Sequence, residues 1–163
     1  MKVRNMAITA LISAMYLVVT MLVAPIGFSV VQFRLSELFN HFIVYNKKYF
    51  YGIVLGVFMS NLLLSPVKAD MIFGVAHTAL SLIIVILMSK VVKNKTWLMV
   101  INAFVFSFNM YIIAFMLKMF MGIESHFLAI YGSLAAGELI TMLVLIPLAI
   151  VINKALKLEK LIG

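Results

Sequence analysis

The sequence predicts an all-α integral membrane protein, a compact six-transmembrane-helix bundle with both termini in the cytoplasm. Three observations predict this fold. Hydrophobic residues make up 66% of the 163 residues and charged residues only 11%, which is unlike the composition of a soluble domain. The apolar residues form runs of membrane-crossing length, and most of the cations lie at one set of run ends.

Each predicted span is judged against the ~20 apolar residues that cross a ~30 Å hydrocarbon core. The first run follows Lys2 and Arg4 and could be a signal peptide, but it is long and ends in Ala24-Pro25, a poor cleavage context, so we expect a retained span. The third run, residues 49–65, is just long enough to cross the hydrocarbon core. The second run, residues 35–46, is short and polar on one side, which favours a tilted or partial span packed against protein. The predicted spans are residues 5–24, 35–46, 49–65, 71–89, 97–117 and 127–153.

The cations set the predicted orientation. Six spans place both termini, the turn at 47–48 and the loop at 90–96 on one side, leaving the longest loops, near 25–34 and 118–126, on the other. One side then holds Lys2, Arg4, Lys47, Lys48, Lys90, Lys93, Lys95, Lys154, Lys157 and Lys160, against Arg34, Lys68 and Lys118 opposite. This bias predicts cytoplasmic termini. No linker interrupts the runs, so residues 1–163 are expected to form a single transmembrane domain.

Polar residues inside the outer half of the predicted bundle fall on one face of each span. The faces are Glu37, Asn40 and His41; Asp70, Gly74, His77 and Ser81; and Tyr131 with Glu138, while Asn61 lies near the outer end of the third span. These faces are expected to point inward and form a pocket that opens outward. Glu138, ~16 Å below the outer start of its span at 1.5 Å per residue, is the member for which function is favoured, because a mid-bilayer carboxylate is costly.

The other polar residues also have structural interpretations. Arg34 could pair with Glu37, and Glu37 could interact with the dipole at the start of its helix. His77 could be a neutral core residue, and Asn61 and Asn109 could link helices. Asp70 and Lys68 could form a solvated loop pair, and Glu124 and His126 are expected to be solvated.

Small residues dominate the inner half. Ala10 and Ala14 lie in the first span, and Gly52, Gly56 and Ser60 repeat every four residues in the third. This spacing lets helix backbones approach closely, either within the bundle or against a separate membrane partner.

Several function classes are excluded or disfavoured. The net charge of +8 is spread in small groups between apolar runs, so nucleic acid is not an expected partner. The absence of cysteine excludes disulfides and thiol chemistry. No phosphate-binding loop, H-E-x-x-H or G-x-S-x-G pattern is present, so we expect neither ATP hydrolysis by that loop nor catalysis, and no cofactor or metal.

A polar hexapeptide, Gln32-Phe33-Arg34-Leu35-Ser36-Glu37, lies between the first two predicted spans. It occurs together with Ala10 and Ala14, Ala24-Pro25, Gly52 and Gly56, and Asp70, Phe73 and Gly74. This set of residues resembles the QueT family. The likeness covers most of the chain and is strongest over residues 1–75. From residue 97 onward it is mainly one of hydropathy, so Asn109 and Glu138 are not carried over from the family.

The resemblance implies the substrate-binding S component of an energy-coupling factor vitamin transporter, in the plasma membrane of a bacterium. Such a component captures a queuosine precursor outside, while a transmembrane coupling protein and two cytoplasmic ATPases supply the energy. Ala10 and Ala14 would contact the coupling protein, and the loop after the first helix would gate the site.

A 7-deazaguanine can be matched to the polar residues. Its N1–H and 2-amino group form a donor pair that a carboxylate accepts, its carbonyl needs a donor, and its ring favours an aromatic neighbour. An aminomethyl substituent would need a second carboxylate. The expected substrate-binding residues are Gln32, Phe33, Arg34, Glu37, Asn61, Asp70, Phe73, His77, Asn109, Tyr131 and Glu138. The alternatives are an S component for another vitamin, a secondary transporter with a Glu138–His77 proton relay, and a non-transporting assembly module.

Overall fold

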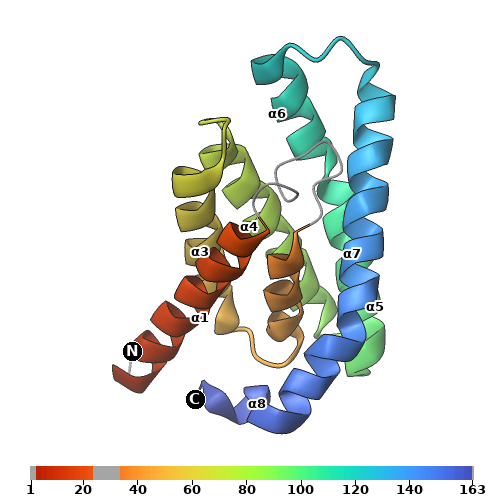
Figure 1. Ribbon diagram of the computed structural model, residues 1–163. Helices are drawn as coiled ribbons and strands as arrows, with labels where there is room; N and C mark the ends of the chain where they lie inside the picture. Colours follow the sequence, from red (N-terminus) through yellow and green to blue (C-terminus); the bar gives the residue numbers. More distant parts are fainter. Residues whose placement is uncertain (1–2, 24–33, 163) are drawn as a thin grey trace.

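The computed structural model describes residues 3–23 and 34–162, and within these ranges the chain is entirely helical. Figure 1 shows the helices as one bundle, with both termini at one end, here called the terminal end. The loop between α6 and α7 lies at the other end, here called the loop end. The elements in chain order are α1 (Val3–Leu22), η1 (Leu35–Val44), α3 (Tyr49–Leu64), α4 (Asp70–Met88), α5 (Lys95–Asn109), α6 (Tyr111–Met121), α7 (Phe127–Leu156) and α8 (Leu158–Leu161).

The distribution of side chains is that of a membrane protein. In the described part of the chain, four helical segments are long and apolar enough to cross a membrane, namely α1, α4, α5 with α6, and α7. Large apolar side chains such as Ile72, Leu128 and Val144 are exposed on their surfaces, whereas Asn40, Asn102 and many other polar residues are fully buried. The α3 helix is shorter. The predicted count of six spans and the cytoplasmic location of the terminal end stay predictions.

Close packing of α1 on α3 explains the glycine repeat of the third predicted span. A Cβ atom on Gly52 would lie 3.0 Å from the Thr9 carbonyl oxygen, and one on Gly56 would lie 2.7 Å from Tyr16 Cβ. Of the two roles that this small-residue spacing allowed, the two glycines therefore serve packing within the bundle. Ala10 and Ala14 are on the exposed side of α1, away from this contact.

The second predicted span is confirmed as a short segment packed against protein. Every residue from Ser36 to Val44 is buried. The segment is a 3₁₀ helix, with the backbone N–H of Glu37 donating to the Arg34 carbonyl and that of Tyr45 donating to Phe42. Residues three apart eclipse one another in this geometry. Glu37 and Asn40 therefore share a face of the segment. The prediction that His41 lies on the same face assumed an α-helix and is wrong.

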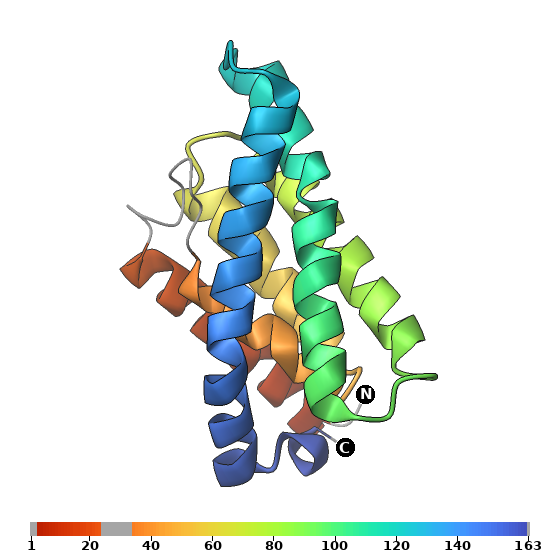
Figure 2. The same ribbon diagram turned by 90° about the vertical axis from the view of Figure 1, so that its right-hand side faces the viewer.

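The fifth predicted span is longer than expected. The α5 and α6 helices follow one another with a break at Met110, and together they run from Lys95 to Met121. The predicted outer loop at 118–126 is thus corrected to residues 122–126. Gly122, with φ of +61°, ends α6 in a left-handed conformation that suits glycine. Figure 2 shows α5 and α6 running alongside α7 for most of its length.

The C-terminal segment folds under the terminal end of the bundle. The Tyr49 hydroxyl donates to the Leu158 carbonyl at 2.9 Å, Asn46 Nδ2 donates to Ile162 at 2.8 Å, and Arg4 Nη2 donates to Leu161 at 3.0 Å. Leu158 is fully buried. These contacts join both ends of the described chain to the turn before α3.

Candidate substrate-binding site

A cluster of charged side chains is buried where η1, α4 and α7 approach one another. Its members, here called the charged cluster, are Arg34, Glu37, Asp70 and Glu138, and each is at most 7% exposed. Arg34 has electrostatic interactions with all three carboxyl groups. One positive and three negative formal charges give the cluster a formal charge of −2. Such a group inside an apolar bundle is costly unless a function retains it.

Arg34 forms an ion pair with Asp70. Arg34 Nη2 lies 3.5 Å from Asp70 Oδ2, and the two side chains are 9% and 3% exposed. Arg34 precedes η1 in extended conformation, while Asp70 is the first residue of α4. The sequence suggested that Arg34 could pair with Glu37 and Asp70 with Lys68. The structure instead pairs Arg34 with Asp70, which is buried, while Arg34 also interacts electrostatically with Glu37.

Glu37 is held by two neutral donors. The Tyr16 hydroxyl donates to Glu37 Oε1 at 3.3 Å, and Asn40 Nδ2 donates to Glu37 Oε2. Asn40 can reach the carboxylate because residues three apart are stacked in a 3₁₀ helix. Tyr16 was not among the residues expected at the site. Its position could have been predicted, because Ser13, Tyr16 and Thr20 form a polar stripe on one buried face of α1.

Glu138 is the deepest carboxylate. It is 1% exposed, and no N–H donor among the described residues reaches either carboxylate oxygen. Glu37, Arg34 and Tyr16 interact with it electrostatically, and the Glu37 carboxyl group lies within hydrogen-bonding reach of it. A buried carboxylate without donors is unfavourable. Its two free oxygens can therefore accept a pair of hydrogen bonds from a bound molecule.

The absence of a side chain at Gly74 brings α3 and α4 together beside the cluster. Asn61 Nδ2 donates to the Asp70 carbonyl oxygen at 3.0 Å. A Cβ atom on Gly74 would overlap Asn61 Nδ2 and lie 2.8 Å from Asp70 Oδ1. Gly74 thus lets Asn61 reach across to α4 and fixes the start of that helix.

His77 and Asn109 are part of a hydrogen-bond network between α4 and α5, and His77 also interacts electrostatically with Arg34 of the charged cluster. His77 Nε2 lies 3.0 Å from the Phe106 carbonyl oxygen. Asn109 Nδ2 donates to Ser81 Oγ at 2.9 Å, and that hydroxyl donates to the His77 carbonyl at 2.8 Å. These contacts agree with the structural interpretation of both residues. His41 is similar, since its Nε2 lies 2.9 Å from the Met142 carbonyl oxygen.

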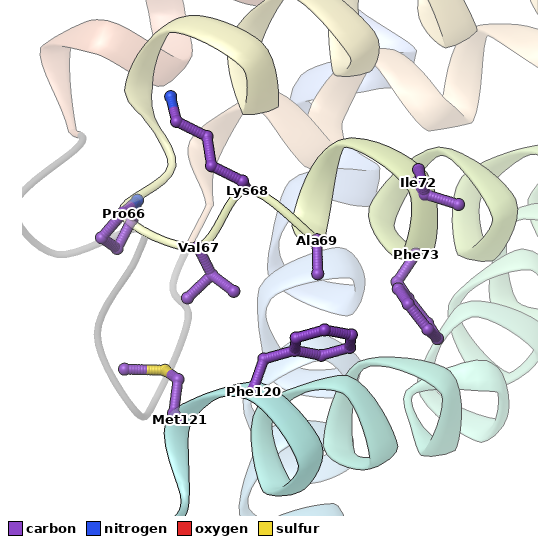
Figure 3. Close-up of a pocket in the computed structure, with 8 residues that line it drawn as sticks. All are labelled: Pro66, Val67, Lys68, Ala69, Ile72, Phe73, Phe120 and Met121. Atoms are coloured by element: carbon purple, nitrogen blue, oxygen red, sulfur yellow. The ribbon is translucent and has the colours of Figure 1, made fainter.

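Phe73 and Tyr131 lie nearer the loop end. Phe73 packs against Phe120, and the Tyr131 hydroxyl donates to the Phe108 carbonyl oxygen at 3.2 Å. Figure 3 shows Phe73 and Phe120 next to each other in the lining of a groove of about 700 Å³. The groove is lined by Pro66, Val67, Lys68, Ala69, Ile72, Phe73, Phe120 and Met121. It is mostly apolar, with Lys68 as its charged member.

The structure thus brings four of the expected binding residues into the charged cluster and Asn61 beside it. It places His77 and Asn109 in the network between α4 and α5, and Phe73 and Tyr131 toward the loop end. Gln32, Phe33 and the expected gating loop lie outside the described residues. The cluster is rich in acceptors and poor in cations, so it suits a ligand that offers several N–H donors or a positive charge.

Comparison with known proteins gives two findings. The family described as QueT transporter matches residues 6–154. The chain is also 31% identical over 152 residues to the queuosine precursor transporter QueT of Lactococcus lactis subsp. cremoris (strain MG1363), with 88% of each chain covered. No solved structure matches the chain. Both matches cover the charged cluster, and both describe transporters.

Proposed function

We propose that this chain, which belongs to the QueT transporter family, is the membrane subunit that binds a queuosine precursor of the 7-deazaguanine type for uptake into a bacterial cell. Glu138 is the observation that carries the proposal. It is a fully buried carboxylate whose two oxygens have no N–H donor among the described residues. The N1–H and 2-amino group of a 7-deazaguanine are a donor pair that one carboxylate can accept.

The other members of the charged cluster support the same ligand. Arg34 or Asn61 can donate to the ring carbonyl, and both lie beside Asp70. Glu37 and Asp70 supply further acceptors for a polar substituent. A site built from such groups rejects analogues without the donors, because the buried acceptors would then lack partners.

Energy for uptake is proposed to come from partner subunits. The chain has no phosphate-binding loop, so we assign ATP hydrolysis to two cytoplasmic ATPases joined through a transmembrane coupling protein. The free face of α1 supports a docking role. Ala10 and Ala14 are exposed, whereas Ile12 and Tyr16 on the opposite side pack against α3. Small side chains on an exposed helix face let a second membrane helix approach closely.

The docking assignment is tested by placing a large side chain on this face. Ala10→Trp and Ala14→Trp are expected to abolish ATP-dependent uptake in cells and to leave substrate binding to the purified protein unchanged. Ile140→Trp is the matched control, because Ile140 is 61% exposed on α7 and away from the alanines. It should change neither quantity. Loss of binding in the alanine variants would show that these residues pack the bundle instead.

The choice of driving force is tested in the same cells. Uptake should require the ATPase subunits and persist when an uncoupler collapses the proton gradient. Uptake that survives without the ATPases and stops with the uncoupler would contradict this assignment and favour a proton-coupled secondary transporter.

A further inference from the structure

A cavity of about 280 Å³ lies at the terminal end of the bundle, where the end of η1 and the turn after it meet the loop between α4 and α5. In Figure 2 this loop lies at the terminal end. None of the lining residues belongs to the charged cluster, so the cavity is separate from the candidate substrate-binding site. They are Ile43, Val44, Tyr45, Asn46, Lys47, Ser89, Val92, Lys93, Lys95 and Leu98.

Three lysines give the cavity a positive charge. Lys47, Lys93 and Lys95 are among its lining residues, and none of the described residues that line it is acidic. Lys95 Nζ lies 3.9 Å from Glu159 Oε1, but these side chains are 47% and 53% exposed, and an exposed pair interacts weakly. Three positive charges less the one negative charge of Glu159 leave an excess of two positive charges at the cavity.

Backbone carbonyls hold two of the three ammonium groups in place. Lys95 Nζ donates to the Val44 carbonyl oxygen at 2.8 Å. Lys93 Nζ donates to the carbonyl oxygens of Lys90 at 2.6 Å and Ser89 at 3.5 Å. These acceptors are neutral, so they position the cations without cancelling their charge. An ammonium group has three N–H donors, so each of these two lysines keeps at least one donor for an anion.

The remainder of the cavity is largely apolar, and apolar surface continues beside it. Val92 and Leu98 belong to the lining. Their sequence neighbours Val91 and Trp97 are 79% and 64% exposed. Tryptophan at the end of a membrane helix is typical of the headgroup level of a bilayer. A soluble anion would use the lysines alone, whereas an amphiphile with an anionic head would use both the lysines and the apolar surface.

The geometry points to a binding site for the phosphate headgroup of an anionic phospholipid. The lysines donate to the headgroup, and the acyl chains lie along the exposed apolar residues beside Val92 and Leu98. Basic pockets between membrane helices on the cytoplasmic side bind headgroups of this kind, and the terminal end is the end predicted to be cytoplasmic. The site is independent of the proposed function and of the substrate.

The test uses Trp97, the only tryptophan of the chain, which lies in the first turn of α5 two residues after Lys95. Full-length protein is reconstituted in phosphatidylcholine vesicles that contain increasing fractions of brominated phosphatidylglycerol, or the same fractions of brominated phosphatidylcholine. Bromine quenches tryptophan fluorescence on contact. Each lysine near the surface strengthens the binding of an anionic lipid about fivefold, so two excess charges predict a preference for phosphatidylglycerol of about 5- to 25-fold.

Charge-removing variants locate the site. Lys47→Gln with Lys93→Gln should reduce the preference to within about twofold, because it leaves only Lys95 opposite Glu159. Quenching by brominated phosphatidylcholine should not change in this variant, which checks that the surroundings of Trp97 are intact. Lys68→Gln with Lys118→Gln is the matched control. It removes the same charge from exposed positions toward the loop end and should keep the preference.

Three results would overturn the inference. Equal quenching of the unmodified protein by the two brominated lipids would show that the cavity does not select an anionic lipid. An unchanged preference in the Lys47→Gln and Lys93→Gln variant would show that the selection takes place elsewhere. Displacement of the brominated phosphatidylglycerol by inorganic phosphate at constant ionic strength would show a site for a free anion instead of a lipid.

Discussion

Replacing Gly74 with alanine tests how tightly α3 and α4 must approach to build the charged cluster. The new Cβ atom would overlap Asn61 Nδ2 and lie 2.8 Å from Asp70 Oδ1. Both neighbours are buried, Asn61 at 2% and Asp70 at 2% exposure. Neither can move away without breaking the hydrogen bond from Asn61 to the Asp70 carbonyl or disturbing the ion pair with Arg34.

The expected change in stability follows from three contributions. Loss of the Asn61–Asp70 hydrogen bond costs about 1 kcal/mol, and forcing an extra carbon into a packed site costs about 1–3 kcal/mol. Alanine recovers about 1 kcal/mol relative to glycine in a helix interior. Gly74→Ala should therefore lower the free energy of unfolding by about 1–3 kcal/mol, and binding of a 7-deazaguanine should weaken with it.

The assay is reversible unfolding of the purified protein in mixed micelles, followed by circular dichroism. Gly132→Ala is the matched control, because a Cβ atom on Gly132 in α7 would meet nothing within 4 Å. That variant should be as stable as the unmodified protein or gain up to about 1 kcal/mol.

Two results would contradict the close approach of α3 and α4 at Gly74. Gly74→Ala could prove as stable as Gly132→Ala, which would mean that α3 and α4 do not approach as described. Alternatively, Asn61→Ala could fail to relieve the effect of Gly74→Ala. Because the two side chains compete for one space, their combined cost should fall short of the sum of the single costs by about 1 kcal/mol.

Two further changes probe contacts elsewhere in the bundle. Arg34→Ala should lower the free energy of unfolding by about 3–5 kcal/mol, because it leaves the buried Asp70 carboxylate without its guanidinium. The double variant Arg34→Ala with Asp70→Ala should recover part of this loss. A double variant no more stable than Arg34→Ala alone would contradict the ion pair. Tyr49→Phe removes the hydroxyl that donates to Leu158 and should cost about 0.5–1.5 kcal/mol while making the C-terminal segment more accessible to protease. Unchanged stability and cleavage would show that this contact does not hold the segment.

Hydrophobic patterning predicted much of the fold. The runs of apolar residues locate the long helices to within a few residues, and the short polar-sided segment after Arg34 is buried as expected. The stripe that includes Asp70, His77 and Ser81 does face inward. These features depend on local sequence and on the length of a membrane crossing, so a single sequence contains the information.

Features that depend on the local form of the helix were not predictable in the same way. An α-helical periodicity places Glu37, Asn40 and His41 together, but the 3₁₀ form of η1 separates His41, which faces α7. Likewise, the break at Met110 divides one apolar run into two helices. Both depend on packing against neighbouring helices, which no pattern within the segment records.

The candidate site was partly predictable for the same reason. Sequence reasoning placed Glu138 and Asp70 on inward faces. The only pairing it offered for Arg34 was with Glu37, and the ion pair with Asp70 was missed because it depends on how η1 meets the start of α4. The Tyr16 contact to Glu37 was missed for a similar reason, since it joins residues 21 positions apart.

The most direct test of the central claim is to identify the small molecule that the purified protein carries. Protein extracted from cells grown with queuosine precursors is washed, denatured and analysed by mass spectrometry, beside the Glu138→Gln variant prepared in the same way. We expect a 7-deazaguanine at close to one molecule per chain in the unmodified protein, and its loss from the variant. A bound vitamin without that ring system, or equal amounts of ligand in both proteins, would contradict it.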